Sequence, residues 1–162
     1  MREPRFGLRA SAPADVAALT DLWVAAWRAT GLAVDFEARR DWFAVRLAEL
    51  AANSADIVVA EAEDGALAGF VTIQPDSGHL DQLCVAPARQ GSGVAALLLE
   101  AAKARAPGCV RLEVNADNAR ARRFYLREGF IEIGRGASPA SGLPILHMEW
   151  RAAGVASEDR HS

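Results

Sequence analysis

Residues 85–97 read Val85-Ala86-Pro87-Ala88-Arg89-Gln90-Gly91-Ser92-Gly93-Val94-Ala95-Ala96-Leu97. Pro87 is expected to end a strand, and good helix formers fill residues 94–106. The stretch therefore predicts a strand, a tight loop of small residues and the first turn of a helix. Such a turn leaves backbone N–H groups unpaired at a helix N-terminus, where the helix dipole favours a phosphate or pyrophosphate. The alternative is a tight strand-to-helix connection in which glycine is present only because it can adopt the backbone dihedral angles of the turn.

Two common phosphate-binding loops do not fit this stretch. A Walker loop has a lysine followed by serine or threonine after its last glycine, whereas Val94 and Ala95 follow Gly93. The dinucleotide fingerprint needs a third small residue after a longer gap and an acidic residue on a following strand. The spacing in this chain is instead Gln90-x-x-Gly93-x-Ala95.

That spacing resembles the acyl-CoA signature of the GCN5-related N-acetyltransferase (GNAT) family, Gln/Arg-x-x-Gly-x-Gly/Ala. The lead-in, residues 78–87, is similar to the family's fourth strand. A second match follows at residues 115–130, Asn115-Ala116-Asp117-Asn118-Ala119-Arg120-Ala121-Arg122-Arg123-Phe124-Tyr125-Leu126-Arg127-Glu128-Gly129-Phe130. It meets every fixed position of the family's Asn-x-x-Asn-x-x-Ala-x-x-Phe-Tyr-x-x-x-Gly-Phe. The resemblance is close over residues 78–130 and looser over residues 8–151.

Composition is that of one packed domain. The chain has 162 residues, 51% of them hydrophobic, which predicts a single domain over residues 1–151 and a flexible tail over 152–162. No apolar run reaches the roughly 18 residues of a membrane span, and no signal peptide is evident. Two isolated cysteines favour a reducing cytoplasm, and the net charge of −3 does not suggest a nucleic-acid partner. A homodimer stays open, and we expect no metal because the histidines and cysteines lack ligand spacing.

Periodicity and turn signals predict eleven elements in a mixed α/β order. Expected strands are 6–10, 57–62, 66–74, 79–85, 110–114, 130–135 and 145–151, and expected helices are 16–30, 36–52, 94–106 and 118–128. We expect Asp15 to cap the first helix, Asp64-Gly65 to form a hairpin turn and Gly129 to end the last helix. The resemblance implies the GNAT fold: a central, mostly antiparallel sheet, splayed between its fourth and fifth strands and flanked by four helices.

The resemblance also implies where acetyl-CoA, the acyl donor, would bind. In the family the pantetheine arm pairs with the exposed edge of the fourth strand, as an added strand would. The residues expected to hold it are Leu83, Cys84 and Val85, and Asn118 would also contact this arm. The pyrophosphate would lie on the amides of Gln90, Gly91, Ser92, Gly93, Val94 and Ala95. The basic run at Arg120, Arg122, Arg123 and Arg127 could attract the anionic cofactor, but we interpret it as a solvated helix face.

Candidate catalytic residues follow from the same resemblance. Tyr125, the only tyrosine of the chain, matches the family's tyrosine beside the thioester sulfur and could protonate the leaving thiolate; packing is its alternative role. The N–H of Val85 would polarise the thioester carbonyl. His79 and Asp81, two apart and therefore on one strand face, are candidate bases. So is Glu113, which shares a face with Asn115. Ordered water is the alternative to any of these bases.

The acceptor is least defined by the sequence. The resemblance implies a pocket lined by the first two helices and their connection, residues 23–40. Candidate acceptor contacts are Trp27, Asp35 and Asp81, although tryptophans are more often core and acidic residues more often solvated. His147 and Glu149 could also reach this pocket. The first hypothesis is an N-acetyltransferase acting on a small primary amine. The alternatives are acetylation of a protein N-terminus or lysine, and a non-catalytic acyl-CoA sensor.

Overall fold

The computed structural model describes residues 6–31, 35–139 and 141–153, and in this part of the chain strands and helices follow the predicted order. The strands are β1 Phe6–Ala10, β2 Asp56–Ala62, β3 Leu67–Ile73, β4 Leu80–Val85, β5 Cys109–Asn115, β6 Ile131–Ala137 and β7 Pro144–Arg151. The helices are α1 Val16–Arg28, α2 Arg40–Ala52, α3 Val94–Arg105 and α4 Ala119–Arg127. Most of the predicted tail, residues 154–162, lies outside the described residues.

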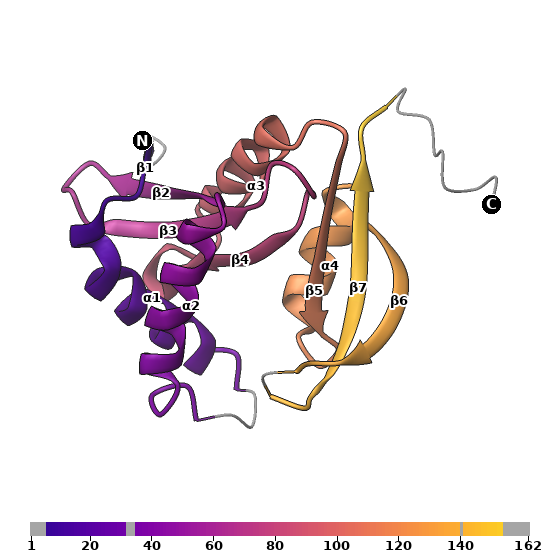
Figure 1. The fold of residues 1–162 in the computed structure, drawn as a ribbon, viewed down its shortest axis with the longest axis horizontal. Coiled ribbons are helices and arrows are strands. Elements are labelled where there is room, and N and C mark those ends of the chain that lie inside the picture. Colours follow the sequence, from indigo (N-terminus) through magenta and orange to yellow (C-terminus); the bar gives the residue numbers. More distant parts are fainter. Residues whose placement is uncertain (1–5, 32–34, 140, 154–162) are drawn as a thin grey trace.

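The strands form two antiparallel sheets, and the strands of the second sheet run across the direction of those in the first (Figure 1). The first has the order β1-β2-β3-β4 and the second the order β5-β7-β6. Between the sheets, the described residues make a single bridge, His79 to Arg111, immediately before β4. The predicted mixed α/β fold with a sheet splayed between the fourth and fifth strands is therefore confirmed.

Two apolar layers cover the first sheet. Helix α3 packs on one face, where its Leu98 and Leu99 are fully buried together with residues of β2, β3 and β5. Helices α1 and α2 cover the other face, where Phe43 and Phe70 are fully buried. Figure 1 shows α4 against the second sheet, on the other side of the molecule from α1 and α2.

Among the described residues, no helix combines the length and apolar character needed to cross a membrane.

Two local predictions at the N-terminal half are wrong. Asp15 does not cap α1: its carboxylate accepts the Ala12 N–H at 2.7 Å and pairs with Arg9, so it closes the 3-10 turn Pro13–Asp15. The hydrogen bonds from Arg9 and Ala12 lower the pKa of Asp15 to about 2. Helix α2 begins at Arg40 rather than at Phe36. Residues 36–39 form turns instead, and Phe36 is buried in the core beside α1.

At Gly69, β3 approaches β4 and α3 so closely that one added methyl group is expected to destabilise the fold. A β-carbon on Gly69 would lie 2.6 Å from the Cys84 carbonyl oxygen and 3.0 Å from Leu98 Cδ1. We expect Gly69→Ala to lower the free energy of unfolding by about 1–3 kcal/mol through overpacking. Gly7→Ala is the matched control, because no atom lies within 4 Å of its β-carbon. Urea titration of both variants tests this, and equal midpoints would contradict it.

Candidate active site

A cleft opens where β4 and β5 part. Their contact is made next to Gly78, whose carbonyl accepts the Arg111 N–H at 2.8 Å. Only glycine fits there, because its φ is +77° and a β-carbon would collide with the Cys109 carbonyl. Beyond this point β4 pairs only with β3, and β5 only with β7. The resulting cavity of about 860 Å³ lies between β4, α3 and α4, and its size is typical of small-molecule sites.

The inner edge of β4 offers unpaired backbone groups to this cleft. The Ala86 N–H donates to Ala68 at 2.8 Å, and the Gln82 N–H donates to the Thr72 hydroxyl at 2.9 Å, so both point toward β3. Because backbone direction alternates along a strand, the N–H and C=O groups of Leu83 and Val85 point the other way, into the cleft. Those of Cys84 point toward β3. This edge can pair with an extended ligand, as an added strand would.

The loop at the end of the cleft is built to bind an anion. Gly91 and Gly93 have φ values of +81° and +89°, which turn the chain into α3. Five backbone N–H groups at this turn donate no hydrogen bond within the described residues. They belong to Gly91, Gly93, Val94, Ala95 and Ala96. Ser92 differs, because its N–H and hydroxyl both donate to the Arg89 carbonyl. Free amides at a helix N-terminus favour a phosphate group.

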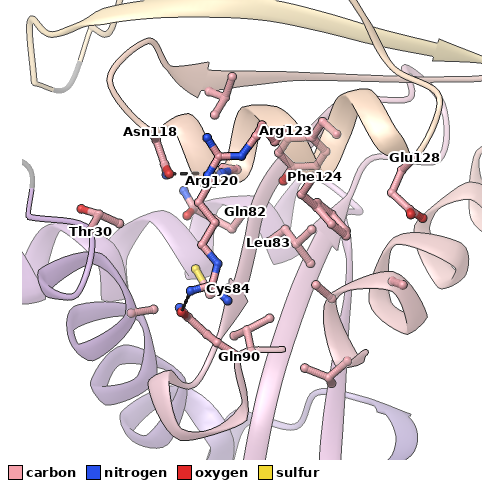
Figure 2. Close-up of a pocket in the computed structure, with 18 of the residues that line it drawn as sticks. Thr30, Gln82, Leu83, Cys84, Gln90, Asn118, Arg120, Arg123, Phe124 and Glu128 are labelled. Carbon is pink, nitrogen blue, oxygen red and sulfur yellow. Dashed lines mark hydrogen bonds between the residues drawn. The ribbon is translucent and has the colours of Figure 1, made fainter. Parts of the chain in front are cut away.

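Basic residues of α4 and of the loop line the same cavity. Figure 2 shows Arg120 crossing the cleft from α4, where its guanidinium donates to the Gln90 side chain. Arg89, Arg123 and Arg127 also line the cavity. Arg122 turns away and pairs with Glu132 at 3.1 Å. Arg120, Arg123 and Arg127 are exposed, as predicted for a solvated helix face, and their spacing of three and four residues places them together on the side of α4 that lines the cleft.

Asn118 and Tyr125 bring α4 to the cavity wall. Asn118 caps the helix, because its Oδ1 accepts the Ala121 N–H at 3.2 Å, as drawn in Figure 2. Tyr125 is 7% exposed, and its ring packs edge-on against Phe124 and Phe130. Burial raises the pKa of Tyr125, with a smaller contribution from Cys84, so the phenol keeps its proton at neutral pH. Burial also raises the pKa of Cys84 to about 12, which makes its thiol a poor nucleophile.

A carboxylate lies between two imidazoles on the β5 side of the cleft. Glu113 Oε1 is 2.9 Å from His79 Nε2, and Glu113 Oε2 is 3.7 Å from His147 Nδ1. The hydrogen bond from Glu113 raises the pKa of His79 above its usual value, and the same contact lowers the pKa of Glu113. Glu113 itself lines the cavity. Two of the predicted bases are therefore partners in one hydrogen bond.

Asp81 lies close enough to His79 for its charge to raise the pKa of that imidazole, and it also forms a β-bulge in β4. A β-bulge places Ile73 opposite Leu80 and Thr72 opposite Gln82, so Asp81 is the extra residue. Its carboxylate pairs with Arg46 of α2 at 2.6 Å and accepts a hydrogen bond from the Gln82 side-chain amide at 3.1 Å. Asp81 still lines the cavity.

A smaller cavity of about 100 Å³ adjoins the cleft on the α1 and α2 side. Its walls include Trp23, Trp27 and Phe36, and Trp27 also lines the large cavity. The indole N–H of Trp27 is buried beside the Cys84 sulfur and has no nitrogen or oxygen partner in the described part of the chain. Asp35 lines neither cavity; its carboxylate accepts the Ala38 N–H at 3.1 Å and so closes a turn.

A comparison with known protein families identifies the family to which this fold belongs. The family model described as "Acetyltransferase (GNAT) domain" matches residues 34–152. The chain belongs to the GNAT family. It is therefore an N-acetyltransferase, as the two sequence motifs predict. A comparison with curated protein sequences gives no match.

Solved GNAT-like structures share the fold over almost the whole chain. YjaB from Escherichia coli, solved without ligand, is 25% identical with a TM-score of 0.75, covering 92% of this chain and 99% of that one. PaiA N-acetyltransferase from Thermoplasma acidophilum, solved with coenzyme A, is 20% identical with a TM-score of 0.73, covering 91% and 99%. YncA from Salmonella typhimurium, solved with acetyl-CoA, is 20% identical with a TM-score of 0.65, covering 94% and 97%.

Several contacts of the GNAT site were missed by the sequence analysis, although His147 itself was named there as a residue that could reach the acceptor pocket. Arg46 lies 35 residues before its partner Asp81, and no local pattern links the two. His147 reaches Glu113 because β7 pairs with β5 in a register that sets these residues opposite each other. Arg39 faces the small cavity from the turn before α2. Arg120, Arg123 and Arg127 of α4 carried a usable signal, since their spacing of three and four residues places them on one face of the helix.

Proposed function

We propose that the chain transfers an acetyl group from acetyl-CoA to the primary amine of a small molecule, by direct attack within a ternary complex. The observation that carries this proposal is the open edge of β4 leading straight into the free amides at the start of α3. An extended arm ending in a pyrophosphate matches that arrangement. PaiA and YncA, which share the fold, were solved with coenzyme A and acetyl-CoA.

The donor would be held mainly by the main chain. The pantetheine arm would pair with Leu83 and Val85, beside Cys84, and Asn118 would contact it with its free amide nitrogen. The pyrophosphate would accept from the amides of Gly91, Gly93, Val94 and Ala95, because the N–H groups of Gln90 and Ser92 already donate to Pro87 and Arg89. Arg89, Arg120 and Arg123 line the cavity near that loop and would balance the phosphate charge. This set of groups fits acetyl-CoA in shape and in charge.

The reaction then requires three groups of the protein: one that stabilises the developing oxyanion, one that donates a proton and one that accepts a proton. The Val85 N–H, on the open edge, would donate to the thioester oxygen as negative charge develops there. Tyr125, protonated and buried in the cleft wall, would supply a proton to the sulfur as the C–S bond breaks. The pair of His79 and Glu113 would take the proton that the amine loses as the C–N bond forms, directly or through water.

The pH dependence of turnover tests the proposed base. His79 must be neutral to accept a proton, so the rate rises as pH passes through the pKa of His79. Glu113 and, more weakly, Asp81 raise this pKa, whereas burial and Arg46 lower it. We expect the rising limb of wild type to lie above ~6.5, the ordinary value for histidine. In Glu113→Gln the limb should move to lower pH, because the raising contact is lost.

His79→Ala is the second variant of this experiment. The rising limb of its turnover–pH profile should disappear or move toward the pKa of the acceptor amine itself. A His79→Ala profile that overlays wild type would assign His79 a structural role and leave Glu113 or water as the base.

Acceptor size separates the small-amine proposal from protein acetylation. The side cavity of about 100 Å³ suits a compact group rather than a peptide segment. The test follows thiol release from acetyl-CoA with small primary amines and with peptides bearing a free N-terminus or lysine. Faster turnover with peptides would contradict the proposal. Release with neither, despite tight coenzyme binding, would favour a sensor.

A further inference from the structure

The small cavity has rigid, apolar walls that continue into the donor cleft. Trp23 stacks on Phe43 at 4.6 Å and meets Phe36 edge-on at 5.6 Å. The indole N–H of Trp23 donates to Gln82 at 3.1 Å, which fixes the ring further. Trp27 and Gln82 line both cavities. A molecule seated against these rings can therefore present one end to the donor.

The volume of this cavity limits what fits its walls. At about 100 Å³ it is smaller than the 150 Å³ cavity that holds benzene in an engineered core. Trp42 is 41% exposed at the rim, where it can cover a group that extends outward. The walls thus suit a compact apolar group of the size of a branched aliphatic side chain, and a larger side chain would extend outward beneath Trp42.

The charge around the cavity is positive. Two of the candidate carboxylates are already paired, Asp81 with Arg46 at 2.6 Å and Glu37 with Arg40 at 3.0 Å, and the third, Asp35, lines neither cavity. Among the described residues that line the small cavity, Arg39 carries the only charge. No ion pair or hydrogen bond of its guanidinium is found with any described residue. A polyamine would meet no free carboxylate here, whereas an anionic group would meet an unpaired arginine.

We infer that the acceptor is an α-amino acid, or a close analogue, with an apolar side chain. Its carboxylate pairs with Arg39, its side chain packs among Trp23, Trp27 and Phe36, and its amine faces the donor cleft. The inference rests on the proposed acetyltransferase function and names the substrate class. The α-nitrogen forms a bond to the acetyl carbon and loses a proton to the His79–Glu113 pair. The C–S bond breaks, and the sulfur takes a proton from Tyr125.

The experiment uses matched substrates and matched variants. Leucine, methionine and phenylalanine are compared with the amines that lack only the carboxylate, and with spermidine, by thiol release and mass detection of the N-acetyl product. The proteins are wild type, Arg39→Gln and Arg105→Gln; Arg105 lies at the end of α3 and lines neither cavity. A charge-assisted contact predicts that Arg39→Gln raises KM for the amino acids about tenfold or more with little change in kcat.

The same variant should leave the carboxylate-free amines unaffected, and Arg105→Gln should behave as wild type throughout. The inference is overturned if spermidine or the carboxylate-free amines are acetylated as well as the amino acids. It is also overturned if Arg39→Gln changes both substrate sets equally. If no amine is acetylated while acetyl-CoA still binds, the proposed function fails together with the inference, and this outcome is distinct from the other two.

Discussion

Gly93→Val is expected to weaken acetyl-CoA binding about 100-fold or more. At a φ of +89°, a β-branched residue is strongly disfavoured, so the loop must change its conformation. The amides that follow, from Val94 to Ala96, would then lose their common direction toward the phosphates. Losing two charge-assisted hydrogen bonds, at roughly 1.5–3 kcal/mol each, corresponds to a factor of about 100 or more. Isothermal titration calorimetry with acetyl-CoA measures this.

Gly65→Val is the matched control for that titration. Gly65 lies in the β2–β3 hairpin with a φ of +85°, and a β-carbon there also meets no atom within 4 Å. The two variants should therefore lose similar amounts of thermal stability, while only Gly93→Val loses affinity. Wild-type affinity in a folded Gly93→Val protein would contradict the loop's role.

Tyr125→Phe is expected to lower kcat about 100-fold while leaving acetyl-CoA affinity within about twofold of wild type. General-acid catalysis by one side chain contributes on this scale, and it acts as the thiolate departs rather than in ground-state binding. The ring contacts with Phe124 and Phe130 involve no hydroxyl, so the fold should be retained. Steady-state turnover on an accepted amine, with calorimetry for affinity, measures both effects.

Turnover on the amine is essential to the Tyr125 experiment, because slow thioester hydrolysis would not report on the same step. A Tyr125→Phe enzyme that acetylates the amine at the wild-type rate would leave Tyr125 as a packing residue.

The cofactor half of the site could be predicted from local sequence because its geometry is local. Gln90-x-x-Gly93-x-Ala95 dictates a turn with positive φ at glycine and a helix that starts with free amides. The order of strands and helices followed from periodicity in the same way. Helix α2 was set four residues too early, because aromatic Phe36 packs into the core from a turn and mimics a helical position.

The catalytic half could not be predicted in detail, because it depends on register and on distant pairing. One inserted residue, Asp81, shifts the register of β4 against β3, and strand alternation alone does not predict this bulge. The contact of His147 with Glu113 arises from the register of β5 with β7. The contact of Arg46 with Asp81 arises from the packing of α2 over the sheet. Neither of these leaves a pattern in the neighbouring residues.

Transfer of a labelled acetyl group tests the central claim most directly. The protein is incubated with acetyl-CoA carrying ¹³C in its acetyl group and with a mixture of small primary amines, and products are read by mass spectrometry. The account predicts that the label appears on an amine nitrogen, one acetyl group for each coenzyme A thiol released. Release of thiol with the label recovered only as acetate, or no release despite bound acetyl-CoA, would contradict it.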